Sequence, residues 1–307
     1  MQKSLYRLLL FLVPILIAWG GLEYFYRAVP NNYTVKRDYL QNHADEIEVL
    51  LFGSSHYLYG LNPDYFSKHT FNLSNVSQTI YFDHLLFKRY IESLPRLKKV
   101  VFCIEYTNLS QTDNTQDDVF RKYYYNAFMD LPSPIVSAWD PKKYSLALSR
   151  SLDASLTQLQ KYWDNGTIVS CDTKGWGNDY AKEKRRPPQL TGKQRARAHE
   201  DGLMDFRINT AKIRSMIVEC QQRGIKVFIV SLPQSKSYSD HLNQKKLKAI
   251  FETCRSFETT FSANTHYLNL FNDPRFQDSD FYDADHLNDS GAEKCSKIVN
   301  NFINEND

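Results

Sequence analysis

The feature that most constrains this chain is an apolar run that ends abruptly in small polar residues. Ile47–Phe52 is followed directly by Gly53, Ser54, Ser55 and His56. A parallel strand covered on both faces reads as a near-continuous apolar run, and a glycine after it permits a sharp turn. Ligands of open α/β sheets bind beyond the carboxyl ends of the strands. The run therefore predicts a buried strand that delivers two serines to a site, although Gly-Ser pairs also occur in ordinary turns.

Strand-like and helix-like segments alternate through much of the chain. The apolar runs predict further strands at 70–73, 100–104, 227–232 and 267–270. Helical spacing of apolar residues predicts helices at 80–94, 203–222, 241–257 and 288–303. Such alternation is typical of a parallel sheet wrapped by helices. We predict a three-layer α/β/α fold with a parallel sheet of about five strands, similar to flavodoxin.

The regular pattern breaks between about residues 110 and 200. This segment holds an aromatic cluster, a predicted helix from about Pro141 to Trp163, and a basic run from Lys182 to Arg197 that includes Arg195. We interpret it as a large insertion that either shapes a substrate site or covers one side of the sheet. The basic run is expected to be a solvated surface, with contact to anionic lipid or an anionic polymer as the alternative.

The N-terminus has the composition of a membrane segment. Lys3 and Arg7 precede the apolar run Leu8–Leu22, and no A-x-A cleavage site follows it. We therefore favour an uncleaved signal anchor over residues 1–27, with a cleaved signal peptide and a buried soluble helix as alternatives. The preceding positive charges predict that the N-terminus lies in the cytoplasm and the body of the chain, residues 28–307, on the extracytoplasmic side of the cytoplasmic membrane. Residues 28–45 are polar, which is typical of a tether or an entry segment.

Composition argues against several classes of function. The formal net charge of the 307 residues is only +3, and no long basic stripe with aromatic residues suggests nucleic acid as a partner. The five cysteines form no C-x-x-C pair, so a zinc or redox site is not expected, and their disulfide pairing is left open. The remaining histidines show no ligand spacing. We expect neither a metal nor a cofactor.

An Asp-x-x-His pattern lies between the last predicted strand and the last predicted helix. Across one tight turn, Asp283 can hold one ring nitrogen of His286 and leave the other free to accept a proton. A serine at the end of the first strand would then be the nucleophile, since a bare hydroxyl needs such a base. Asp285 is the rival orienting carboxylate and His56 the rival base, both judged the poorer choice. Ordinary polar loop residues are the alternative reading of the pattern.

The combination of these segments resembles the SGNH/GDSL hydrolase superfamily over roughly residues 47–108 and 200–305. The Gly-Asp-Ser block of that family matches Gly53–Ser55, which implies that Ser55 is the nucleophile and gives one oxyanion amide. The last block matches Asp283 and His286. Ser54 stands where the family has Asp.

The resemblance also implies two further oxyanion donors. The second family block matches the region 72–79, and Ser77 stands where a glycine amide is usual. The third block, Gly-x-Asn-Asp in the family, matches residues 106–109 and keeps only the asparagine, as Asn108. The implied oxyanion hole is the amides of Ser55 and Ser77 with the side chain of Asn108.

With its anchor, the chain looks like the extracytoplasmic branch that includes D-alanyl-transfer proteins and exopolysaccharide O-acetyltransferases. This implies an ester hydrolase or O-acyltransferase that works through an acyl-serine intermediate on acylated carbohydrate of a cell-surface polysaccharide. A multi-pass membrane acyltransferase is then an expected partner. The alternative is a catalytically inactive domain that binds glycan or scaffolds that acyltransferase, because the family positions at Ser77, Thr107 and Leu109 have changed.

Overall fold

The computed structural model describes residues 2–113 and 119–307, so Met1 of the expected anchor and residues 114–118 of the expected insertion lie outside the described residues. The chain divides into two compact units. As far as their residues are described, the first comprises Met1–Arg37 and Asp117–Val169. The second comprises Asp38–Gln116 and Ser170–Asp307.

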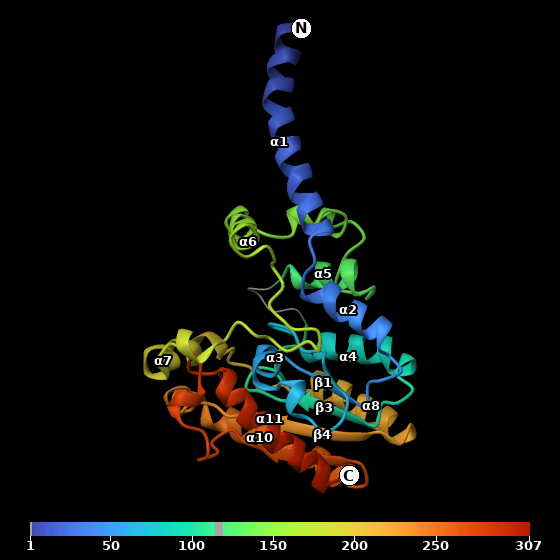
Figure 1. Ribbon diagram of the computed structural model, residues 1–307, viewed down its shortest axis with the longest axis vertical. Coiled ribbons are helices and arrows are strands. Elements are labelled where there is room, and N and C mark those ends of the chain that lie inside the picture. The colour runs from blue at the N-terminus through green and yellow to red at the C-terminus, as the bar shows by residue number, and fades with distance from the viewer. Residues whose placement is uncertain (1, 114–118) are drawn as a thin grey trace. The chain divides into compact units, whose positions relative to one another are not determined.

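The second unit is built on a parallel sheet of five strands (Figure 1). The strands are β1 (Val49–Phe52), β2 (Thr70–Asn72), β3 (Lys99–Cys103), β4 (Lys226–Ser231) and β5 (Thr265–Asn269). All pair in parallel, in the order β2-β1-β3-β4-β5. The predicted α/β fold with five parallel strands is confirmed. The order reverses between β1 and β3, the switch point at which sheets of this kind bind ligands.

Helices cover both faces of this sheet. Those of the second unit are α3 (Ser55–Gly60), α4 (Ile80–Tyr90), α7 (Pro188–His199), α8 (Arg207–Gln222), α9 (Lys236–Ser239), α10 (Gln244–Thr260) and α11 (Asp289–Glu305). Single 3-10 turns are η1 (Pro63–Tyr65), η2 (Ile91–Ser93), η5 (Lys182–Lys184) and η6 (Asp278–Asp280). The predicted helices of this unit therefore exist with shifted ends, whereas α3, α7 and α9 were not expected.

Alternate residues of β1 point to opposite faces of the sheet, and both faces are buried. Leu51 joins a core cluster with Val299 of α11, whereas Phe52 contacts the ring of Phe87 in α4. This two-sided burial is why the strand reads as an apolar run rather than an alternating one. It also rigidly fixes the position at which the strand ends.

The turn after β1 requires glycine. A Cβ on Gly53 would lie 2.5 Å from the Cβ of Cys103 on the neighbouring strand, closer than real side chains approach. The side chain of Ser54 then caps α3 by accepting a hydrogen bond from the amide of His56. Ser55 is thus the first residue of a helix rather than part of an irregular loop.

The first unit is helical. It contains α1 (Gln2–Ala28), the start of α2 (Asn32–Asn42), α5 (Arg121–Phe128), α6 (Leu152–Asn165) and the 3-10 turns η3 (Pro141–Lys143) and η4 (Leu146–Leu148). Edge-to-face aromatic contacts join its helices, for example Tyr26 of α1 with Tyr124 of α5. The apolar part of α1 lies within the one helix, among the described residues, that is long and apolar enough to cross a membrane.

Two local expectations were wrong in this part of the chain. Residues 28–45 are not a tether, because most of them form α2 despite their polar composition. The expected helix from Pro141 to Trp163 is broken into η3, η4 and α6. Asp140 caps η3 at the predicted start by accepting from the amide of Lys142, and Ser151 caps the separate start of α6 by accepting from the amide of Ala154.

Candidate active site

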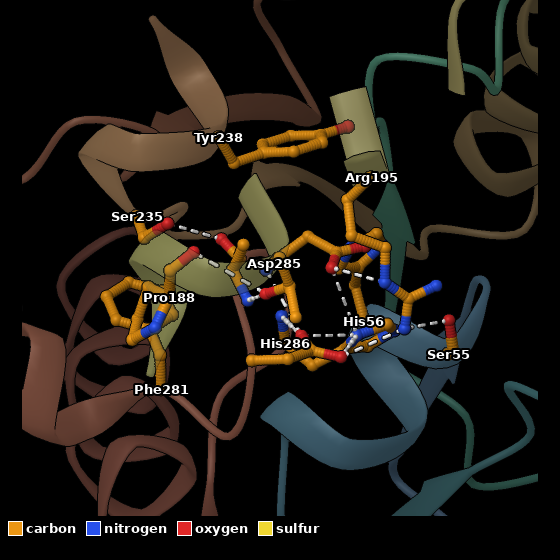
Figure 2. A network of polar contacts seen from close by, with 12 residues as sticks. Ser55, His56, Pro188, Arg195, Ser235, Tyr238, Phe281, Asp285 and His286 are labelled. Carbon is orange, nitrogen blue, oxygen red and sulfur yellow. Dashed lines mark hydrogen bonds and ion pairs between the residues drawn. The ribbon is translucent and has the colours of Figure 1, made fainter. Parts of the chain in front are cut away.

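Three predicted site residues meet at the switch point of the sheet. The Oγ of Ser55 lies 2.9 Å from Nε2 of His286, and Nδ1 of His286 lies 3.0 Å from Oδ1 of Asp283 (Figure 2). His286 and Asp283 are buried, whereas Ser55 is partly exposed. The arrangement is a serine held by an imidazole that is in turn held by a carboxylate. Such an arrangement can transfer a proton from a nucleophilic hydroxyl.

The turn that carries Asp283 and His286 is shaped by Asp283 itself. Its Oδ1 accepts hydrogen bonds from the backbone amides of Asp285, at 3.2 Å, and His286, at 2.9 Å. The amide of Tyr282 donates to the carbonyl of His286 across the same turn. One carboxylate therefore fixes both the backbone and the ring, which is how a spacing of three residues produces an oriented base.

Asp285 is the weaker orienting group, as expected. Its Oδ1 lies 3.5 Å from Nδ1 of His286, beyond a good hydrogen bond. The carboxylate is fully buried among side chains that can carry positive charge, at 3.4 Å from His56, 3.3 Å from Arg195 and 3.8 Å from His199. Asp285 thus serves as the centre of an ion-pair cluster rather than as the partner of the base.

His56 is not the base, and it forms a buried ion pair instead. Its Nδ1 lies 2.6 Å from Oε2 of Glu105, which follows β3. Its ring stacks on that of His286, with centroids 4.6 Å apart. Its side chain turns away from that of Ser55 because both residues belong to α3, in which successive side chains point about 100° apart.

Glu105 is a functional candidate that the sequence analysis overlooked. Besides His56, it accepts hydrogen bonds from Ser54 Oγ at 2.6 Å and Cys103 Sγ at 2.9 Å. Ser54 stands where the family has Asp, and it links the turn after β1 to this buried acid. The sequence did contain a signal for Glu105, because a charged residue directly follows the apolar run 100–104. Such a position predicts a side chain at the edge of the sheet.

Arg195 contradicts our expectation that the basic run is only a solvated surface. It lies on α7, and its guanidinium donates to Oδ2 of Asp283 at 2.9 Å and lies 3.3 Å from Asp285. Figure 2 shows its side chain reaching from α7 toward the buried acids. The 170–200 part of the segment that we read as an insertion therefore supplies a cation to the site.

The charges around His286 nearly balance. Burial disfavours its imidazolium, but Asp285 and the hydrogen bond with Asp283 outweigh burial and the opposing charge of His56, so the pKa of His286 is raised. Burial also opposes charge on His56, yet Glu105 and Asp285 raise its pKa to about 10. The same pairing overcomes burial of Glu105 and lowers its pKa to about 2. At neutral pH the base thus stands beside a permanently charged imidazolium.

The implied oxyanion donors lie on the neighbouring strand ends. Ser77 adopts a left-handed backbone with φ of 54°, which explains why glycine is usual there. Its loop is fastened to the first turn, because the amide of Asn75 donates to the carbonyl of Gly53 at 3.2 Å. Asn108 is buried, and its Oδ1 accepts from the amide of Glu105 at 2.5 Å, which orients the amide group.

Aromatic rings from three segments line one side of the base. Tyr180 stacks between Tyr59 and Tyr282, with centroid distances of 3.6 and 4.0 Å, and its edge faces His286 at 5.3 Å. The chain around Tyr180 is held against α3, because the amide of Gly177 donates to the carbonyl of Leu58. Segment 170–200 therefore also builds a wall of the site.

His56, Asp285 and His286 offer ligand atoms within 4.8 Å of one another, the spacing of a metal site. However, Arg195 already places a positive charge 3.3 Å from Asp285, and Nε2 of His286 is already in hydrogen-bond contact with Oγ of Ser55. The donor set fits an ion-pair cluster better than a divalent cation. The five cysteines are buried free thiols, so none of them pairs in a disulfide.

Comparisons with known proteins identify similar folds only. A scan against protein-family models and a search of curated proteins each find no match. Among solved structures, the chain is similar to a protein from Streptococcus pneumonia suggested to be a platelet activating factor, with 12% identity, 95% of this chain and 98% of that chain covered, and a TM-score of 0.43.

Two further similar structures come from Bacteroides. One is a suggested acylhydrolase from Bacteroides fragilis, with 12% identity, coverage of 87% and 95%, and a TM-score of 0.41. The other is a GDSL-like lipase from Bacteroides thetaiotaomicron, with 13% identity, coverage of 90% and 100%, and a TM-score of 0.42. These values carry no inference about activity, which rests on the chain's own residues.

The two acids of the turn should differ in their effect on acyl-ester hydrolysis. We expect Asp283→Asn to lower kcat by about 10³–10⁴-fold, because an amide favours the wrong tautomer of His286. Asp285→Asn should lower kcat less, because Asp285 makes no short bond to the ring. Steady-state kinetics on a small acyl ester measures both, with thermal unfolding to check the fold. An equal or larger loss of kcat in Asp285→Asn would exchange the two assignments.

The His56–Glu105 pair should make stability depend on pH. The folded-state pKa of His56, about 10, lies above its usual value of about 6.5 in an unfolded chain. While Glu105 is charged, the raised pKa of His56 therefore stabilises the fold fully below the lower value, and this contribution is lost as pH rises through the higher one. Chemical denaturation across this pH window should show a falling free energy of unfolding. The neutral double variant His56→Gln/Glu105→Gln should show a flatter dependence, and an unchanged slope would contradict the ion pair.

Proposed function

We propose that the protein is a serine-dependent acyl-ester hydrolase or O-acyltransferase. The observation that carries this proposal is the continuous contact from Ser55 through His286 to Asp283. A hydroxyl that lies 2.9 Å from a neutral imidazole nitrogen can lose its proton as it attacks a carbonyl carbon. The partial exposure of Ser55 supports attack on a group presented from outside.

In this mechanism, His286 takes the proton of Ser55 while Oγ bonds to the acyl carbon. The amides of Ser55 and Ser77 and the side chain of Asn108 hold the oxyanion, each contributing on the order of 10²–10³ in rate. As the first residue of α3, Ser55 has a backbone amide without an intrahelical acceptor, which supports this role. His286 then protonates the leaving alcohol, and the acyl group stays on Ser55.

A second nucleophile completes the cycle. Its hydroxyl gives a proton to His286 and its oxygen attacks the acyl-serine, which releases Ser55 with its proton restored. With water the net reaction is hydrolysis, and with a sugar hydroxyl it is acyl transfer. The raised pKa of His286 helps it to hold the proton between these steps.

We place this reaction outside the cytoplasmic membrane, on acyl groups of a cell-surface polysaccharide. The support is the apolar helix α1 with Lys3 and Arg7 before it, which favours a cytoplasmic N-terminus and an exported catalytic unit. The family resemblance of the sequence supports the polysaccharide substrate and a multi-pass acyltransferase as partner. An exported enzyme would meet cell-surface polymers and not the esters of the cytoplasm, which supports a polymer as the acyl donor or acceptor.

Fluorophosphonate labelling tests the catalytic proposal. This probe bonds to an activated serine, so the full-length protein in detergent should be labelled and Ser55→Ala and His286→Ala should not. Ser54→Ala is the matched control: it removes the neighbouring hydroxyl, which Glu105 binds, and should keep most of the label. An unlabelled wild-type protein that still binds polysaccharide would instead support the inactive, glycan-binding alternative.

The acyl content of the cell-surface polymer tests the substrate and the direction of the reaction. Cells that carry Ser55→Ala should retain extra acyl esters if the protein hydrolyses them, and should lack them if it transfers them. Mild alkaline release of the acyl groups, followed by mass spectrometry, measures the difference. Cells with Ser54→Ala are the control for expression and folding. An acyl content equal in all three strains would refute the polysaccharide substrate.

A further inference from the structure

Within the first unit, segment 144–147 is hydrogen-bonded to the part of α1 between Trp19 and Arg27. The indole of Trp19 donates to Ser145 Oγ at 2.9 Å, and the carboxylate of Glu23 accepts from the same hydroxyl at 2.7 Å and from the amide of Ala147 at 3.0 Å. One helical turn further on, Arg27 donates to the carbonyl of Tyr144. The segment 144–147 is thus held beside α1 between Trp19 and Arg27.

That level coincides with the end of the apolar part of α1. Arg7 and Glu23 bound the uncharged run Leu8–Leu22. At 1.5 Å per residue this run spans roughly 22 Å, which is less than the roughly 30 Å of hydrocarbon in a bilayer. A bilayer that covers this run therefore extends beyond it at one or both ends, with Glu23 near its boundary. Segment 144–147, which is bonded to Glu23, would then lie near the depth of the lipid headgroups.

The elements at this level expose large apolar and aromatic side chains. Trp139 is 95% exposed, Tyr144 63%, Leu152 65%, Leu156 54% and Trp163 86%. We call these five residues the collar. Its members on α6 are four and eleven residues apart, so they share one stripe of the helix.

A neighbouring side of α6, about a quarter turn from the stripe, is occupied by α1. Ser155 accepts a hydrogen bond from the hydroxyl of Tyr26 at 2.9 Å, and the ring of Tyr162 meets that of Phe25 edge-on. Figure 1 shows α6 beside the end of α1 that is remote from the N-terminus. The stripe of Leu152, Leu156 and Trp163 is not part of this contact and stays exposed beside the same end of α1.

We propose that the collar inserts into the headgroup region of the phospholipid bilayer that α1 spans. Tryptophan and tyrosine prefer this region, where an apolar ring and a polar edge are both satisfied, and exposed Lys142 beside Trp139 suits anionic headgroups. The inference rests on the membrane anchorage proposed above. The collar gives the first unit a second, peripheral contact with the membrane, in addition to the spanning helix α1.

Quenching by brominated lipid tests the collar in the full-length chain. The protein has four tryptophans, so variants can each keep only Trp19, Trp139 or Trp163 and carry phenylalanine at the other three positions, Trp176 included. Each is reconstituted into phosphatidylcholine–phosphatidylglycerol vesicles with or without bromine on the acyl chains. We expect all three single-tryptophan proteins to lose emission in brominated vesicles, with circular dichroism as the check of folding.

A charge placed in the stripe gives the matched comparison. In the variant that keeps Trp163, Leu156→Glu should relieve the quenching, whereas Thr157→Glu, which is exposed on another side of α6, should not. Quenching of Trp19 without quenching of Trp139 and Trp163 would overturn the collar, and the surface would then suit a protein partner. Absence of quenching at Trp19 would overturn the anchorage and the collar with it.

Discussion

Three buried carboxylates at one edge of the sheet determine which charges the rest of the site must carry. Glu105, Asp283 and Asp285 are almost inaccessible to solvent, and unpaired charges in such a place cost several kcal/mol each. His56 and Arg195 supply two fixed positive charges, so the cluster keeps one surplus negative charge. That surplus is what an imidazolium on His286 would neutralise. The balance therefore favours the charged state through which the base would pass in the reaction that we propose.

The sequence was sufficient for the parts of this molecule that depend on local pattern. Two-sided burial makes β1, β3 and β4 continuous apolar runs, so the sheet and its parallel connections could be predicted. Asp283 and His286 could be predicted from their spacing between a predicted strand and a predicted helix. The strand end offered two serines, and the resemblance to the Gly-Asp-Ser block selected Ser55. Their contacts follow from the fold and from a turn that Asp283 organises by itself.

What could not be predicted depends on contacts between distant parts of the chain. Arg195 has the same local surroundings as its solvated basic neighbours, and only the packing of α7 brings it to Asp283. Glu105 lies at a visible strand end, but its partner His56 is 49 residues earlier, beyond any spacing rule. The helices α2 and α3 are too polar or too short to show an apolar period, and capping by Ser54 decides the start of α3.

The start of α3 has a consequence for how such a chain can vary. Ser55 and His56 are neighbours, yet Ser55 is partly exposed and contacts His286, whereas His56 is sealed against two buried acids, so their directions must differ by one helical step. The two residues between β1 and Ser55 determine the direction in which the first side chains of α3 point. A gain or loss of one residue there would turn the imidazolium outward and expose Glu105 without a counter-charge. Loop length at this point is therefore under an electrostatic constraint that comes from the buried acids rather than from the nucleophile.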